Sequence, residues 1–171
     1  MQLKVLLWGA SRCCENGLSA GVIRVGVMSR KLSGLELTAA ATEAMAAVAD
    51  WVADPEGQPV PSRQALADAV RRSAELLAQD APGNTVELRV PPFVAVQCVA
   101  GPVHRRGNPP NVVQCSPLAW LRAAAGAASL TEMSERAGAD AVGSPMGRIS
   151  VGLSGTRASE VERHLPLFGR H

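Results

Sequence analysis

The stretch that decides the fold is TVELRVPPFVAVQCVAGPVHRRGNPPNVVQC, residues 85–115. Apolar and polar residues alternate over residues 86–90, and this period of two predicts a strand with one buried face. A second strand is expected over Phe93–Val99, and because it is apolar on both faces we expect it to be central in the sheet. The segment NVVQC, residues 111–115, predicts a third strand that continues a meander.

Patterns typical of helices lie on both sides of these strands. Residues 33–53 carry apolar side chains at helical spacing, and a segment rich in proline and glycine follows them. The other helices are expected over residues 62–80, 116–126 and 129–138 and, after a last strand at 148–155, from Thr156 onward. Ser62 and Ser116 are the expected N-caps, and SLTE at 129–132 is a capping box. The sequence thus predicts an α+β fold, with a mostly antiparallel sheet of four or five strands covered by helices and preceded by a helical pair.

The amino-terminal segment has a different composition from the rest of the chain. Its apolar run, Val5–Ala10, is too short to span a membrane and marginal for a signal peptide. A second methionine, Met28, follows it. We therefore expect residues 1–27 to be a disordered tail or a mis-assigned start, and residues 28–168 to form one domain. Without a recognisable export signal, the expected location is the cytoplasm.

Charge and aromatic content argue against nucleic acid as a partner. Residues 1–31 hold five basic side chains and one acidic one, whereas residues 32–171 hold twelve basic and fourteen acidic ones. A mildly acidic body lacks the broad basic surface that neutralises phosphates. Aromatic residues make up only 3% of the chain, which is too few for a surface on which bases stack.

Cys98 and Cys115 enclose a loop that admits several interpretations. They lie seventeen residues apart, a spacing that does not fit a zinc site, so we expect no metal and no other cofactor. A disulfide would require neighbouring strands and is uncommon in the cytoplasm. No acid that could orient a catalytic base lies between Glu87 and Glu132, and a thiol in an apolar strand is inert. Buried, reduced thiols are the expectation, with no catalytic residue.

The tip of the same loop carries His104, Arg105 and Arg106. Three prolines stiffen the loop, and the arginines keep it solvated, so it can be a purely structural connection. The alternative is that these three residues form a rim that contacts an anionic head group or the carboxylates of a protein partner.

Two long stretches carry a resemblance to a known family. VPPFVAVQCVAGPVHRRGNPPNVVQCSPLAWLRAAAG and SGTRASEVERHLPLF are similar to the bacterial sterol carrier protein orthologue family, actinobacterial relatives of the sterol carrier protein 2 fold. The resemblance covers about residues 61–168. Two features depart from the family pattern: residues 138–147 look inserted, and Ser159 stands where an aspartate is usual.

The resemblance implies a sheet and covering helices that enclose an apolar tunnel for a lipid-like molecule, without catalysis. We expect the partner to be an apolar small molecule, such as a fatty acyl chain, a sterol or an isoprenoid. Small aliphatic side chains would leave room for it. The candidate lining residues are Phe93, Ala95, Trp120, Leu121, Met133, Val151 and Leu153.

Two alternatives stay open. A similar domain follows the metal-binding half of mycothiol-dependent isomerases and thiol transferases, so the chain could assist such an enzyme. It has three histidines, and none lies between residues 33 and 80, where a helical metal site would need them. The second alternative is a module that binds another protein through the loop tip or the terminal LPLFGRH.

Overall fold

The computed structural model describes residue 32 and residues 34–101, 111–136 and 148–169. The amino-terminal segment and the insertion at 138–147, on which the sequence made predictions, lie outside these residues. The elements are the helices α1 (Leu35–Ala46), α2 (Ala49–Ala53), α3 (Arg63–Asp80), α4 (Pro117–Ala124) and α5 (Leu130–Arg136), the 3-10 helix η1 (Ala158–His164), and the strands β1 (Val86–Val90), β2 (Val94–Cys98), β3 (Val112–Cys115) and β4 (Val151–Ser154).

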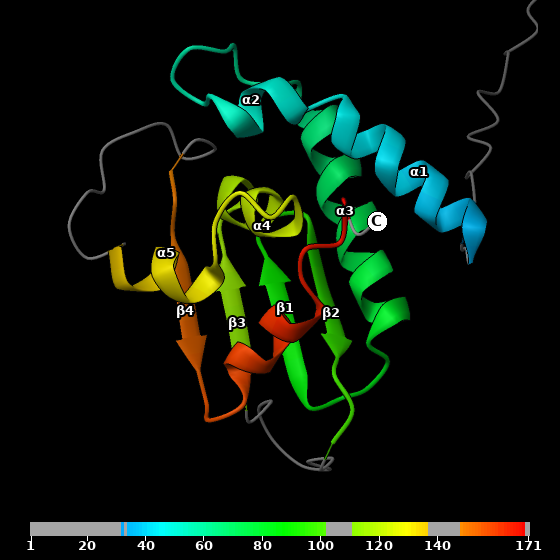
Figure 1. Ribbon diagram of the computed structural model, residues 1–171, viewed down its shortest axis with the longest axis vertical. Coiled ribbons are helices and arrows are strands. Elements are labelled where there is room, and N and C mark those ends of the chain that lie inside the picture. Colours follow the sequence, from blue (N-terminus) through cyan, green and yellow to red (C-terminus); the bar gives the residue numbers. More distant parts are fainter. Residues whose placement is uncertain (1–31, 33, 102–110, 137–147, 170–171) are drawn as a thin grey trace, which may run out of the picture. The chain divides into compact units, whose positions relative to one another are not determined.

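The four strands form one mixed sheet in the order β2-β1-β3-β4 (Figure 1). β1 pairs antiparallel with β2 and parallel with β3, and β3 pairs antiparallel with β4. The predicted α+β class and the mostly antiparallel sheet are confirmed. The predicted meander is wrong, because β1 lies between β2 and β3. The central place predicted for the second strand is also wrong, since β2 is an edge strand.

The order of the strands fixes where the chain crosses from β2 to β3. Cys98, the last residue of β2, is paired with Val86, and Val112, the first residue of β3, is paired with Glu87. Both ends of the connection therefore lie at the amino end of β1, on opposite sides of that strand. The chain must pass this end of β1 on its way between the two neighbours.

One face of the sheet is covered and the other is open. The strands place an apolar set on one face, where the register aligns Leu88 with Val96 and Val113. This set joins buried residues of α3, α4, α5 and η1 in one hydrophobic core. On the opposite face Gln97 and Gln114 are exposed. Ala95 also lies on that open face, which explains why an apolar residue there gave a false signal of a central strand.

The helical pair that the sequence predicted is present, with a break in its first member. The expected helix over residues 33–53 is divided into α1 and α2, because Val48 leaves the helical conformation. The break turns the chain so that Val48, Trp51 and Val52 are all buried. α3 begins where predicted, with Ser62 Oγ accepting a hydrogen bond from the backbone N–H of Ala65 (3.2 Å).

The N-caps predicted for the later helices are observed, and a further residue, Glu162, also caps α5. Ser116 caps α4, and Ser129 Oγ accepts from the backbone N–H of Glu132 (3.2 Å) at the start of α5. The addition is Glu162 of η1, whose carboxylate accepts hydrogen bonds from the backbone N–H and the hydroxyl of Thr131 (2.7 and 2.8 Å). Burial raises the pKa of this carboxyl, but the hydrogen bonds from Thr131 and Ser129 outweigh that effect and lower it overall. The last segment expected as a helix is the 3-10 helix η1.

A buried hydrogen bond joins α3 to α4. Trp120 is fully buried, and its indole N–H donates to Ser73 Oγ (2.8 Å). The Ser73 hydroxyl in turn donates to the carbonyl of Ala69, one turn earlier in α3 (2.7 Å). The serine thus satisfies a polar group that the large tryptophan brings into the core.

We expect Ser73→Ala to lower the free energy of unfolding by about 1–3 kcal/mol, because it leaves the buried indole N–H of Trp120 without a partner. Urea denaturation followed by tryptophan fluorescence measures this. Ser134→Ala, which removes a hydroxyl of a partly buried residue in α5, serves as the control and should cost less. If both variants lower the free energy of unfolding equally, the Trp120–Ser73 hydrogen bond does not contribute more to stability than a partly buried one.

Candidate functional site

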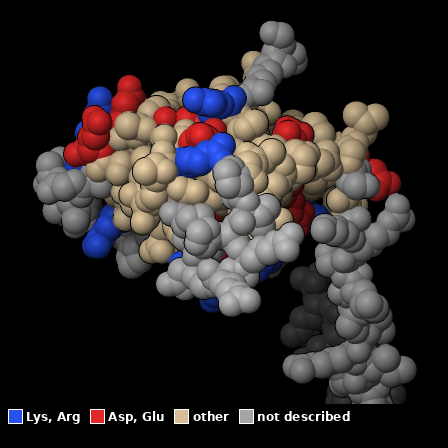
Figure 2. All heavy atoms as spheres, turned by 90° about the horizontal axis from the view of Figure 1, so that it is seen from below, with Lys and Arg blue, Asp and Glu red and all other residues tan. Residues whose placement is uncertain are grey.

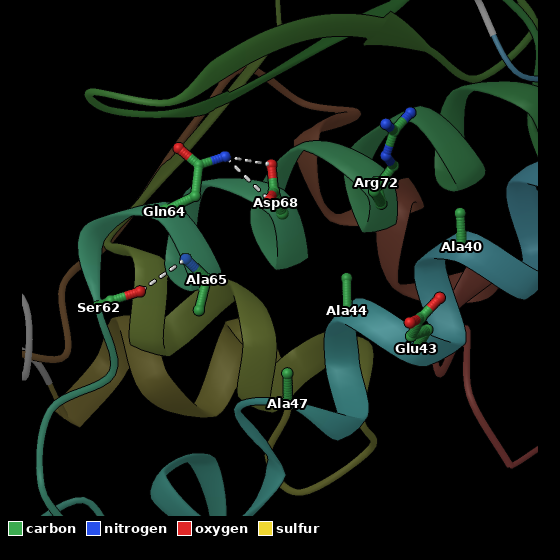
Figure 3. A pocket seen from close by; sticks show the side chains of 9 residues that line it. All are labelled: Ala40, Glu43, Ala44, Ala47, Ser62, Gln64, Ala65, Asp68 and Arg72. Carbon is green, nitrogen blue, oxygen red and sulfur yellow. Dashed lines mark hydrogen bonds between the residues drawn. The ribbon is translucent and has the colours of Figure 1, made fainter.

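A groove between α1 and α3 has a volume of about 500 Å³. In Figure 3 the methyl groups of Ala40, Ala44 and Ala47 point from α1 toward α3, and Ala65 of α3 lies opposite them. Because alanine is short, the two helices leave room between these residues, while larger side chains at Leu37 and elsewhere hold the helices together. The floor of the groove is therefore apolar.

Polar and charged side chains form the rim of the groove. Asp68 accepts two hydrogen bonds from the Gln64 amide, at 2.9 and 3.1 Å. Arg72 forms an ion pair with Glu75 (3.5 Å), and Glu43 stands on the α1 side. An apolar floor with a polar rim is the usual composition of a site for an amphipathic small molecule.

Ala47 also lines a second hollow, which has a volume of about 270 Å³. Trp51, Pro59, Val60 and Pro61 are among its other lining residues. Among the described residues, Val60 is one of two large apolar side chains that are exposed, at 48%. The indole N–H of Trp51 is buried and has no hydrogen-bond partner.

The seven lining residues expected from the sequence are only partly brought together. Trp120 and Leu121 are fully buried in the core, and Phe93 and Met133 are nearly so. Ala95 is separated from them because it lies on the open face of the sheet. Val151 and Leu153 line a shallow hollow of about 330 Å³ along β3 and β4. None of the seven lines the α1–α3 groove.

A second cluster lies where the chain crosses the amino end of β1. Thr85 is 1% exposed, and its backbone N–H donates to the carbonyl of Val99 (3.1 Å). Asn111, 5% exposed, donates from Nδ2 to the carbonyl of Thr85 (2.9 Å) and accepts at Oδ1 from the backbone N–H of Arg157 (3.0 Å). One asparagine thus ties the start of β1 to the segment before η1. We name Thr85, Gly101, Asn111 and Arg157 the loop base.

Backbone constraints at the loop base are severe. Val99 has φ of 64°, a left-handed conformation that a β-branched residue rarely adopts. Gly83 has no room for a side chain, because a Cβ atom there would collide with the backbone of Val99 and Ala100. The surrounding hydrogen bonds hold Val99 in this unfavourable geometry, so the path of the chain directly after β2 is tightly specified.

The charges near the loop base are paired locally. Arg157 Nε donates to the carboxylate of Glu160 (2.8 Å), and this hydrogen bond raises the pKa of the guanidinium and lowers that of the carboxyl. On the face seen in Figure 2, acidic and basic side chains of the described residues lie beside one another amid uncharged surface. The described part of that face has no continuous basic area of the kind that binds nucleic acid.

Cys98 and Cys115 are free and buried, as predicted. Burial raises the pKa of the Cys98 thiol to about 11 and that of Cys115 to about 12. β1 separates their strands, so they are not the neighbours that a disulfide would need. Both thiols remain protonated near neutral pH and pack as small apolar groups.

Some functional candidates were missed by reasoning from the sequence, and others cannot be placed. His104, Arg105 and Arg106 lie outside the described residues. Asn111 and Arg157 belong to the stretches that carried the resemblance, but nothing in their local pattern indicated that they contact each other. The groove had a visible signal, since Ala40, Ala44 and Ala47 recur at helical spacing on one side of α1.

The buried thiols predict a loss of stability at alkaline pH. In the unfolded chain a thiol ionises near pH 8.5, at roughly the reference value. Because the folded pKa values are raised to about 11 and about 12, the folded state keeps protons that the unfolded state loses. Each thiol therefore lowers the free energy of unfolding by roughly 1.4 kcal/mol per pH unit above that point. We expect the free energy of unfolding of Cys115→Ala, measured by urea denaturation between pH 8 and 10.5, to fall less steeply with pH than that of the unmodified protein. The same dependence on pH in both proteins would contradict this prediction.

We expect Asn111→Ala to lower the free energy of unfolding by about 2–3 kcal/mol, because it removes two buried hydrogen bonds and leaves their partners unsatisfied. Gln114→Ala, on the open face of the sheet, is the control and should change it by less than about 0.5 kcal/mol. Thermal and urea unfolding measure both. If Asn111→Ala lowers the free energy of unfolding no more than Gln114→Ala does, the loop base does not stabilise the fold.

Comparison with known proteins places most of this structure in a family. Residues 62–167 match the family model described as bacterial SCP ortholog. The match runs from the cap of α3 to the segment after η1 and leaves out α1 and α2. No curated protein matches the chain. Among the described residues, no helix is long and apolar enough to cross a membrane, and no three His, Cys, Asp or Glu side chains are grouped as a metal site would require. Because the match covers more than half of the chain, the chain belongs to this family of bacterial proteins related to sterol carrier proteins.

Proposed function

We propose that the protein binds and carries an apolar small molecule, such as an acyl chain, a sterol or an isoprenoid, without changing it chemically. The observation that carries this proposal is the α1–α3 groove with its floor of four alanines. Its volume of about 500 Å³ lies within the range of small-molecule sites. Membership of the sterol-carrier-related family supports the same class of ligand.

Ala47, which lines both the groove and the second hollow, indicates how a longer ligand would lie. An alkyl chain would run along the alanine floor and past Ala47 to the hollow beside Val60. Burying the exposed Val60 side chain and the alanine methyl groups would be favourable by the hydrophobic effect.

The protonation of the thiols and the pairing of the charged side chains at the rim support binding rather than catalysis. The raised pKa values of Cys98 and Cys115 leave both thiols without nucleophilic character near neutral pH. At the rim of the groove, Asp68 is engaged by Gln64 and Arg72 by Glu75. These side chains support the walls of the groove and do not form a nucleophile and base pair.

Ala44→Leu tests the groove directly, because the larger side chain would fill its floor. We expect this variant to weaken the binding of a fluorescent fatty acid and of a neutral fluorescent alkyl probe by about tenfold or more, a loss of about 1.4 kcal/mol. Fluorescence titration measures the affinity, and native mass spectrometry with lipid extraction identifies any molecule that copurifies.

Ala46→Leu is the matched control, since Ala46 is an exposed residue of the same helix and does not line the groove. It should bind the probes as the unmodified protein does. Carriage of an apolar ligand would be contradicted by an unmodified protein that copurifies with no lipid and binds neither probe. If both leucine variants bind normally, a ligand is bound but not in this groove.

A further inference from the structure

The part of the chain that forms the α1 side of the groove carries negative charge alone. Residues 34–61 supply this side and all the residues that line the second hollow, and they hold five carboxylates and no lysine, arginine or histidine. Of the five, Glu43 lines the groove and Asp50 lines the second hollow. Both are exposed, and neither forms an ion pair with another described residue. Their charges are therefore available to a ligand.

The α3 side of the groove adds a carboxylate and a paired cation. Asp68 accepts its two hydrogen bonds from the amide of Gln64, which is neutral and leaves the charge of the carboxylate uncancelled. Among the described lining residues Arg72 is the one cation, and its guanidinium pairs with Glu75 at 3.5 Å. In Figure 3 Glu43 belongs to α1 and Asp68 to α3, so the two carboxylates stand on opposite walls of the groove. Because the ion pair is neutral and each carboxylate carries −1, this part of the groove has a net charge of −2.

This negative charge is local, since the chain as a whole has a net charge of +2. The attraction between a charged amphiphile and the whole protein would therefore favour an anion. In the groove the preference is reversed, because a carboxylate head group would lie near like charges and an ammonium near opposite ones. An exposed charge pair changes an affinity by roughly 1.4- to 5-fold, so two carboxylates together are sufficient to select the sign of a head group.

We propose that the α1–α3 groove takes an amphiphile with a cationic head group, an apolar chain that ends in an ammonium, and discriminates against fatty acid anions. The carboxylates of Glu43 and Asp68 place the ammonium, and the chain lies on the alanine floor and extends past Ala47 toward Val60. An anionic amphiphile gains nothing by lying in the reverse direction, because Asp50 lines the other hollow. This inference rests on the proposed function, since it names the head group of the ligand that the groove would carry.

Dodecylamine, dodecanol and dodecanoate are the probes, because they share one chain length and differ in the charge of the head group. At pH 7 the amine is protonated and the acid is ionised. Each competes with the neutral fluorescent alkyl probe for the full chain, below its micellar concentration. We expect dodecylamine to bind at least tenfold more tightly than dodecanoate, with dodecanol between them. This ratio should shrink when the ionic strength is raised from about 0.01 to about 1 M, because the Debye length falls from roughly 30 to roughly 3 Å.

The double variant Glu43→Gln with Asp68→Asn locates the preference, because it removes both charges and keeps the shapes of the side chains. We expect the ratio of the affinities for dodecylamine and dodecanoate to fall about fivefold or more, while the affinity for dodecanol stays the same. Glu56→Gln is the matched control, since Glu56 is an exposed acid of residues 34–61 that lines neither hollow. It should leave the ratio unchanged within about 1.5-fold.

Dodecanoate that binds as tightly as dodecylamine overturns this inference. So does a ratio that persists at high ionic strength, that the double variant does not lower, or that Glu56→Gln lowers equally. Where dodecanol binds in these cases, carriage of an apolar ligand stands and only the cationic head group is wrong. If none of the three amphiphiles binds, the proposed function fails together with this inference.

Discussion

The position of β1 between β2 and β3 is the constraint on which the rest of this structure depends. Both neighbours take their pairing from β1, so the chain has to pass its amino end to go from one edge of that strand to the other. Asn111, the residue before β3, donates a hydrogen bond to the carbonyl of Thr85. The strained backbone of Val99 and the close approach at Gly83 are consequences of the same crossing. The amino end of β1 is therefore a tightly specified part of the sheet.

The helices cover the apolar face of the sheet, and small residues set the spacing between two of them. The sheet has one apolar face, and α3, α4, α5 and η1 bury it together with the indole of Trp120. α1 and α2 add to this layer from outside the part of the chain that matches the family. Their alanines bring α1 near α3 without filling the space between them, which creates a groove on the outer side of the helices. The groove is thus formed between two helices.

Much of the fold could be predicted from the sequence because its signals are local. The caps at Ser62 and Ser116, the alternation along β1 and the buried thiols all depend on neighbouring residues. The order of the strands could not be predicted, because a parallel β1–β3 pair and a meander leave the same pattern in each strand. The loop base was hidden for a similar reason: Asn111 and Arg157 are 46 residues apart, and only the crossing brings them together.

Hydrogen exchange at three backbone amides tests the crossing most directly. The N–H groups of Thr85, Glu87 and Arg157 donate to Val99, Asn111 and the Asn111 side chain, respectively. If the loop base is as rigid as its contacts require, all three exchange only through global unfolding, with the free energy that denaturation gives. Fast exchange at these amides, while the centre of β1 stays protected, would show that the crossing opens locally and would contradict this account.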